Sequence, residues 1–165
     1  HFALGNLYID EGKLESAAEH LSRVTELEPG FVGGWVNLGN VYDEMGQLDP
    51  ALEVYGKALR IAPDDEKTLC NMGGVYFKKR QIHEALESFQ KAIDAHPESQ
   101  LARYNLAILF ADSEIYREAE REWRKVVEID PESDLGQRSA ENIEIIKQLL
   151  SAEMPELPEE QSSQN

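Results

Sequence analysis

The chain has 165 residues, and 41% of them are hydrophobic, which is enough for a folded core. Its 32 acidic and 16 basic residues give a net charge of -16, which disfavours nucleic acid and favours neutral or basic partners. The single cysteine excludes an intrachain disulfide and a multi-cysteine zinc site, and no apolar run is long enough to span a membrane. We expect a soluble, cytoplasmic chain that needs no cofactor and does not insert into a membrane.

Prolines recur along the chain every 34 residues, at Pro29, Pro63, Pro97 and Pro131, and the residues between them align in one register. A fixed period of this length predicts stacked helical units that share their hydrophobic core only with neighbouring units. The four copies cover about residues 1–31, 32–65, 66–99 and 100–133.

Each copy is predicted to contain two helices. In the second copy Trp35, Gly39 and Tyr42 lie on one helical face, and the glycine predicts a close approach to the second helix of the pair. Gly12 and Gly46 fall where a left-handed helix stop is needed. In chain order the predicted helices span residues 1–11, 14–28, 32–45, 48–61, 66–79, 82–95, 100–112 and 116–129.

One further helix is predicted over residues 134–150. Gln137 and Glu141 take the aromatic and small slots there, so this helix is expected to receive nothing on its far side and to cap the array. The residues from 151 to 165 contain two prolines and many glutamates, which predicts a disordered acidic tail. The predicted organisation is therefore a repeat domain over residues 1–150, followed by the tail.

The aligned slots W-x2-L-G-x2-Y, A-x3-aromatic and P resemble the tetratricopeptide repeat signature. The second copy matches it at Trp35, Leu38, Gly39, Tyr42, Ala51, Tyr55, Ala58 and Pro63. The third copy departs from it at Leu69 and Met72. The fourth has Arg103 and Ala107 in place of Trp and Gly, with Trp123 in the later aromatic slot. The resemblance implies an all-α, right-handed superhelical solenoid whose concave groove is lined by the first helix of each hairpin. It also implies a protein-interaction scaffold without enzymatic activity.

Outside the tail, the asparagines fall in only two repeat slots, occupied by Asn37, Asn71 and Asn105 and by Asn6, Asn40 and Asn142. The first slot lies roughly 200° around the helix from that of Trp35, so these side chains point away from the core and toward the groove. An amide that both donates and accepts hydrogen bonds can hold the backbone of an extended peptide. Alternatively, the asparagines fix neighbouring helices to one another. The predicted peptide-binding residues are Asn6, Asn37, Asn40, Lys67, Asn71, Tyr104 and Asn105.

Chaperone-binding members of the family hold a C-terminal carboxylate with two lysines, two asparagines and an arginine. Asn6, Asn37 and Lys67 occupy three matching slots, whereas Phe2 and Asn71 occupy the other two. Such a clamp would carry one positive charge rather than three, which predicts weak binding of an acidic tail.

The remaining groove residues suit an apolar anchor with one or two basic residues. Cys70 and Tyr104 are expected to line the groove, with acidic side chains one turn further along the first helices. The basic run from Lys78 to Arg80 is either a solvated helix end or a docking point for an acidic segment.

Catalysis has little support, because His20, His83 and His96 occupy unrelated repeat slots and show no metal-ligand spacing. The expected partner is a neutral to basic protein or peptide, and the chain is expected to be monomeric. An alternative is a structural module that stacks on further repeats or self-associates through an uncapped N-terminal end carrying Phe2 and Leu4. Because the sequence opens on His1, a piece of a longer protein is expected.

Overall fold

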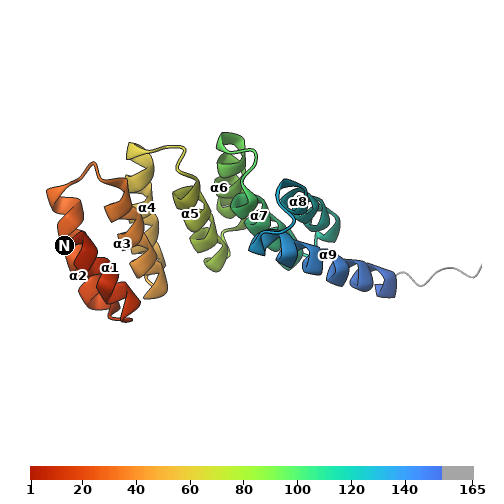
Figure 1. Cartoon of the computed structure of the whole chain (residues 1–165), viewed down its shortest axis with the longest axis horizontal. Helices are drawn as coiled ribbons and strands as arrows, with labels where there is room; N and C mark the ends of the chain where they lie inside the picture. The colour runs from red at the N-terminus through yellow and green to blue at the C-terminus, as the bar shows by residue number, and fades with distance from the viewer. Residues whose placement is uncertain (154–165) are drawn as a thin grey trace, which may run out of the picture.

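A computed structural model of the chain describes residues 1–153, which form nine helices and no strand (Figure 1). The helices are α1 (Phe2–Asp10), α2 (Leu14–Leu27), α3 (Val32–Glu44), α4 (Leu48–Ile61), α5 (Glu66–Lys78), α6 (Ile82–Ala95), α7 (Gln100–Asp112), α8 (Tyr116–Ile129) and α9 (Asp134–Glu153). The ends of the first eight agree with the predicted spans to within one residue. None of these helices is long and apolar enough to cross a membrane.

The two helices of a hairpin approach closely where a glycine of the first helix faces an aromatic ring of the second. A Cβ atom placed on Gly39 would lie 2.4 Å from Cε1 of Tyr55, and one placed on Gly73 would lie 2.6 Å from Cε1 of Phe89. Tyr55 and Phe89 are buried. The close approach expected from the small residue is therefore confirmed, and it fixes the hairpin geometry in the second and third repeats.

A left-handed residue ends the first helix of every repeat. The φ angles are 71° at Gly12, 72° at Gly46, 60° at Arg80 and 61° at Glu114, and the four positions are separated by the repeat period. The expectation for the two glycines is confirmed. Arg80 and Glu114 adopt the same conformation with a Cβ atom present, which costs roughly 1–2 kcal/mol each.

The hairpins stack into a curved solenoid (Figure 1). Each second helix packs on the next first helix: α2 on α3, α4 on α5, α6 on α7, and α8 on α9. The odd-numbered helices also contact one another in sequence, whereas within residues 1–153 the second helices of successive hairpins do not. The odd-numbered helices are therefore closer together and form the inner side of the curve, and we call their exposed surface the inner face.

The last helix packs on both α7 and α8. Ile143 and Ile146 are buried on one side of α9, while Ile145 and Leu149 are exposed. The last helix continues to Glu153, three residues beyond the predicted boundary at residue 150. The segment 151–153 contains no helix-breaking residue, so the backbone ladder can extend. The rest of the predicted disordered tail, residues 154–165, lies outside the described part of the chain.

Candidate partner-binding surface

Asparagine pairs join successive inner helices. Nδ2 of Asn37 donates a hydrogen bond to Oδ1 of Asn6 at 2.8 Å, linking α3 to α1. Nδ2 of Asn71 donates to Oδ1 of Asn40 at 2.8 Å, linking α5 to α3. Oδ1 of Asn40 also accepts a hydrogen bond from the buried Tyr55 hydroxyl at 2.7 Å. These contacts brace neighbouring repeats, which is the alternative role that the sequence left open.

The braced amides retain hydrogen-bonding capacity. Each pair uses one N–H donor and one oxygen acceptor, although an asparagine amide offers two donors and an acceptor with two lone pairs. Within residues 1–153, no protein group donates to Oδ1 of Asn37 or Asn71, and Nδ2 of Asn6 and of Asn40 finds no acceptor. All four side chains are partly exposed. The pairs can therefore brace the helices and still offer groups to a partner.

Asn37 and Asn71 each pair with the asparagine 31 residues earlier. The residue 31 positions before Asn105 is Gly74, which has no side chain. A Cβ atom placed on Gly74 would meet nothing within 4 Å, so this part of α5 faces open space. Asn105 is partly exposed and has no hydrogen-bond partner among the described residues. Asn142, in the other slot, places Nδ2 3.5 Å from the Tyr104 hydroxyl.

Two residues predicted to line the groove are buried instead. Tyr104 is only 7% exposed, since it packs against Trp123 and the Arg138 guanidinium lies 5.0 Å from its ring centroid. The expectation that Tyr104 lies open in the groove is therefore wrong, because α9 places Arg138 over its ring. Cys70 is 2% exposed, and burial, with the nearby Glu66 carboxylate, raises the pKa of its thiol to about 12. Cys70 therefore contributes to the core and does not line the groove.

The basic run in the third repeat is tied to aspartates of its neighbours. Nζ of Lys78 lies 2.7 Å from Asp43 of the second repeat, and Nη1 of Arg80 lies 2.7 Å from Asp112 of the fourth. Lys79 pairs with Asp49. The run therefore stays at a solvated helix end, because Lys78 and Arg80 remain exposed, and it neutralises two of the acids expected in the groove. Each such exposed pair contributes little alone.

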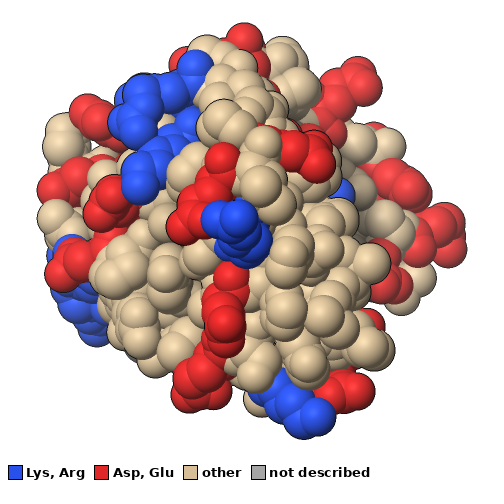
Figure 2. All heavy atoms as spheres, turned by 90° about the vertical axis from the view of Figure 1, so that its left-hand side faces the viewer, with Lys and Arg blue, Asp and Glu red and all other residues tan. Residues whose placement is uncertain are grey.

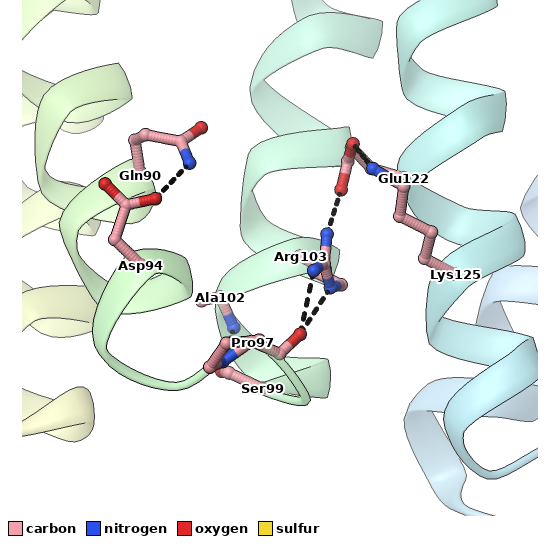
Figure 3. Close-up of polar contacts among 8 residues, drawn as sticks. All are labelled: Gln90, Asp94, Pro97, Ser99, Ala102, Arg103, Glu122 and Lys125. Atoms are coloured by element: carbon pink, nitrogen blue, oxygen red, sulfur yellow. Dashed lines mark hydrogen bonds and ion pairs between the residues drawn. The ribbon is translucent and has the colours of Figure 1, made fainter.

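Arg103 replaces the signature tryptophan of the fourth repeat and keeps its hydrogen bond. In the second repeat, Nε1 of Trp35 donates to the Pro29 carbonyl at 2.8 Å. At the equivalent place, Nη2 of Arg103 donates to the Pro97 carbonyl at 2.7 Å (Figure 3). Nη1 of Arg103 donates to Glu122 at 2.8 Å, and both of these side chains are largely buried.

This buried ion pair was not found by sequence reasoning. The available signal was a glutamate at position 122, in a slot that holds Val54 and Ser88 in the two preceding repeats. Lys125 also donates to Glu122, at 2.6 Å, so the carboxylate has two cationic partners (Figure 3). The cluster joins α7 to α8, and its geometry is that of a packing contact.

An open hollow of about 940 Å³ lies where α5, α7 and α9 begin and α6 and α8 end. Its apolar lining includes Leu101, Leu135 and Ile129. Sequence reasoning missed this hollow as well. A signal existed, because Leu101 and Leu135 occupy one repeat slot, which holds Gly33 and Lys67 in the second and third repeats.

The N-terminal end of the solenoid exposes apolar side chains. Leu4 is 38% and Leu7 49% exposed, whereas their equivalents in the second repeat, Leu38 and Val41, are 3% and 0% exposed because α2 covers them. Figure 2, which looks onto this end, shows broad uncharged areas with charged side chains between and around them.

No group of three or more His, Cys, Asp or Glu side chains in the described range could hold a metal ion. The described surface carries hydrogen-bonding amides, a hollow with apolar and acidic lining, and exposed leucines at the N-terminal end, which are features that contacts with other polypeptides use.

Comparison with known sequences agrees with this fold. Residues 5–46 and 39–80 match the profile described as TPR repeat, and residues 70–134 match that described as tetratricopeptide repeat. The chain belongs to the tetratricopeptide repeat family. No curated protein matches it.

Solved structures with the same fold include MamA, with 17% identity over 91% of this chain and 97% of that one, at a TM-score of 0.70. The tetratricopeptide repeat protein TTC0263 of Thermus thermophilus is 23% identical over 86% of this chain and 79% of that one, with a TM-score of 0.76. The first repeat domain of Spaghetti (RPAP3), bound to the HSP90 peptide SRMEEVD, is 19% identical over 73% of this chain and 93% of that one, with a TM-score of 0.65.

Proposed function

We propose that this chain is a non-enzymatic scaffold that binds an extended segment of a partner protein on its inner face. The observation that carries the proposal is the row of partly exposed asparagine amides along α1, α3, α5 and α7, whose unused donors and acceptors match the needs of a peptide backbone. The Spaghetti domain provides a precedent for peptide binding by this fold.

The proposed partner segment is neutral to basic. The peptide bound by the Spaghetti domain is acidic, but only Lys67 supplies a cation at the slots that hold a carboxylate in chaperone-binding relatives. Asp10 and Glu44 are exposed at the ends of α1 and α3 and have no ion-pair partner within residues 1–153. With a net charge of -16, the chain attracts cationic segments at long range.

Alanine variants of the asparagine stripe test this proposal. Asn37→Ala and Asn71→Ala remove a bracing hydrogen bond as well as a proposed contact, so each is expected to lower stability by about 0.5–1.5 kcal/mol. Asn105→Ala removes no hydrogen bond within the described chain, so stability should not change while affinity for a peptide selected from a display library falls. Calorimetric titration and thermal melting of the same three proteins separate the two roles. Unchanged affinity of Asn105→Ala would refute peptide binding at this stripe.

A second candidate function is assembly through the N-terminal end, and the exposure of Leu4 and Leu7 favours it. Both leucines occupy slots that are covered in the later repeats, so a covering polypeptide would bury apolar surface there. Light scattering on the intact chain, on Leu4→Lys and on the control Leu149→Lys, which alters an exposed leucine at the opposite end, tests this function. Association that Leu4→Lys abolishes and Leu149→Lys preserves supports it, and a monomer in all three proteins opposes self-association.

A further inference from the structure

The hollow at the start of α7 and α9 is lined by apolar side chains and by carboxylates. Leu101 and Leu135 come from the first turns of the two helices, and Ile129, which is 37% exposed, comes from the end of α8. These helix ends are close together because α7 and α9 pack directly on one another and both contact α8.

The hollow depends on leucines that earlier repeats lack. In the second repeat the slot holds Gly33, over which the Phe31 ring is folded, so that a Cβ atom there would lie 2.9 Å from the ring. In the third repeat the same slot holds the exposed Lys67. Only α7 and α9 present leucine at this position, and they are neighbours on the inner side. An apolar pair is therefore formed at one place along the described array.

The lining has carboxylates but no lysine or arginine. Glu66, Glu98 and Asp130 all contribute to it. Glu66 accepts a hydrogen bond from Ser99, whereas Glu98 is exposed and has no ion-pair partner within residues 1–153.

Two cations beside the hollow are already engaged by another carboxylate. Arg103 and Lys125 line an adjoining hollow of about 360 Å³, which shares Pro97, Glu98 and Ile129 with the larger one. Both cations bind Glu122, as Figure 3 shows, and this leaves the shared Glu98 carboxylate open to a partner.

We propose that this hollow receives an apolar side chain of the partner segment, next to a lysine or arginine that pairs with Glu98. The proposal rests on the proposed function, since it supplies the side-chain specificity that a backbone-binding amide row lacks. A buried apolar anchor with charges at its rim is the usual arrangement of a binding hot spot. A second copy of this chain is a poor occupant, because its net charge of -16 would face the carboxylates of the hollow.

An NMR titration of the chain with short defined peptides tests the proposal. The probe is a Gly/Ser decapeptide carrying one leucine followed by two lysines, and its matched controls replace the leucine by serine or the lysines by glutamates. Backbone amides of the non-proline residues in 96–101 and 129–135 report on the hollow, and the asparagine side-chain NH₂ signals report on the stripe. We expect the leucine–lysine peptide to shift the hollow signals and either replacement to weaken binding by about tenfold.

Variants at matched repeat positions sharpen this test. Ile129→Ser and Glu98→Lys should each weaken the leucine–lysine peptide by about tenfold. The control Ile61→Ser changes the residue two repeats before Ile129, and the control Asp64→Lys changes the residue one repeat before Glu98. No leucine pair exists at either place, so both controls should leave the affinity unchanged. Ile129 and Ile61 are both partly exposed, so neither change should unfold the chain, and circular dichroism confirms this.

The outcomes distinguish this proposal from the proposed function. If the peptide shifts the asparagine NH₂ signals but not the hollow, or binds Ile129→Ser and Glu98→Lys as tightly as the parent, the hollow proposal is refuted and the stripe remains. Equal binding of the serine peptide also refutes the hollow proposal. If no peptide shifts either set of signals, both proposals fail.

Discussion

Replacing Gly39 by alanine tests the hairpin geometry most directly. The added Cβ would lie 2.4 Å from Cε1 and 2.7 Å from Cδ1 of Tyr55, closer than real Cβ contacts. The Tyr55 ring is 1% exposed and its hydroxyl is bonded to Asn40, so the ring has no free space into which to move. Overpacking of this kind costs up to about 3 kcal/mol, while alanine gains about 1 kcal/mol over glycine inside a helix. We therefore expect a net loss of stability of about 2 kcal/mol.

Gly74→Ala is the matched control, because Gly74 lies inside α5 and a Cβ atom there meets nothing within 4 Å. This change should stabilise the chain by about 0.5–1 kcal/mol through helix propensity alone. The assay is guanidinium unfolding followed by circular dichroism, comparing whole curves because repeat arrays can unfold in more than one step. If Gly39→Ala unfolds at the same or a higher denaturant concentration than the parent, the hairpin contact has been misassigned.

Three further changes address strain, burial and charge. Glu114→Gly should raise the free energy of guanidinium unfolding by about 1 kcal/mol, because glycine adopts a φ of 61° without the steric strain of a Cβ atom. No gain would mean that the conformation carries no strain. The pKa of the Cys70 thiol is about 12 in the folded chain and 9.0 ordinarily. The contribution of Cys70 to folding stability is therefore complete below pH 9.0 and is lost as the pH rises toward 12. Cys70→Ala should therefore lose less stability than the parent over that range, and equal losses would contradict the burial argument. Arg103→Leu should lower the free energy of unfolding by about 3 kcal/mol, because it leaves the buried Glu122 carboxylate with one cationic partner. Arg124→Leu breaks an exposed ion pair and should lower it by less than about 1 kcal/mol. Similar unfolding midpoints of the two variants would contradict this difference.

The helix order and spans could be predicted from the sequence because the signals that set them are local and repeated. The 34-residue proline spacing and the Gly39 and Tyr42 pattern each depend on residues within one hairpin. Repetition strengthens these signals, because the same slots recur in four copies. Arg80 and Glu114 show the limit of local signals: neither residue type indicates a left-handed stop, and only their alignment with Gly12 and Gly46 does.

Side-chain partners between repeats could not be predicted in the same way, because they depend on packing between hairpins. Tyr104 occupies a groove slot by sequence, yet Arg138 from α9 covers its ring. Lys78 ends a helix, yet its ammonium reaches Asp43 of the preceding repeat, 35 residues earlier. Glu122 lies on α8, yet its carboxylate accepts a hydrogen bond from Arg103 of α7, 19 residues earlier.

The asparagines show what the structure adds to a correctly read pattern. The helical angle correctly separates their stripe from the core, but it does not reveal that an asparagine pairs with the one 31 residues before it. That offset follows from the way adjacent inner helices contact one another, which a single helix does not encode. Once the offset is known, the interruption at Gly74 becomes informative, because it leaves Asn105 without the partner that Asn37 and Asn71 have. The repeated asparagine is thus present at position 105 although residues 1–153 offer it no bracing partner, which gives a physical reason to look for the partner of Asn105 in another polypeptide.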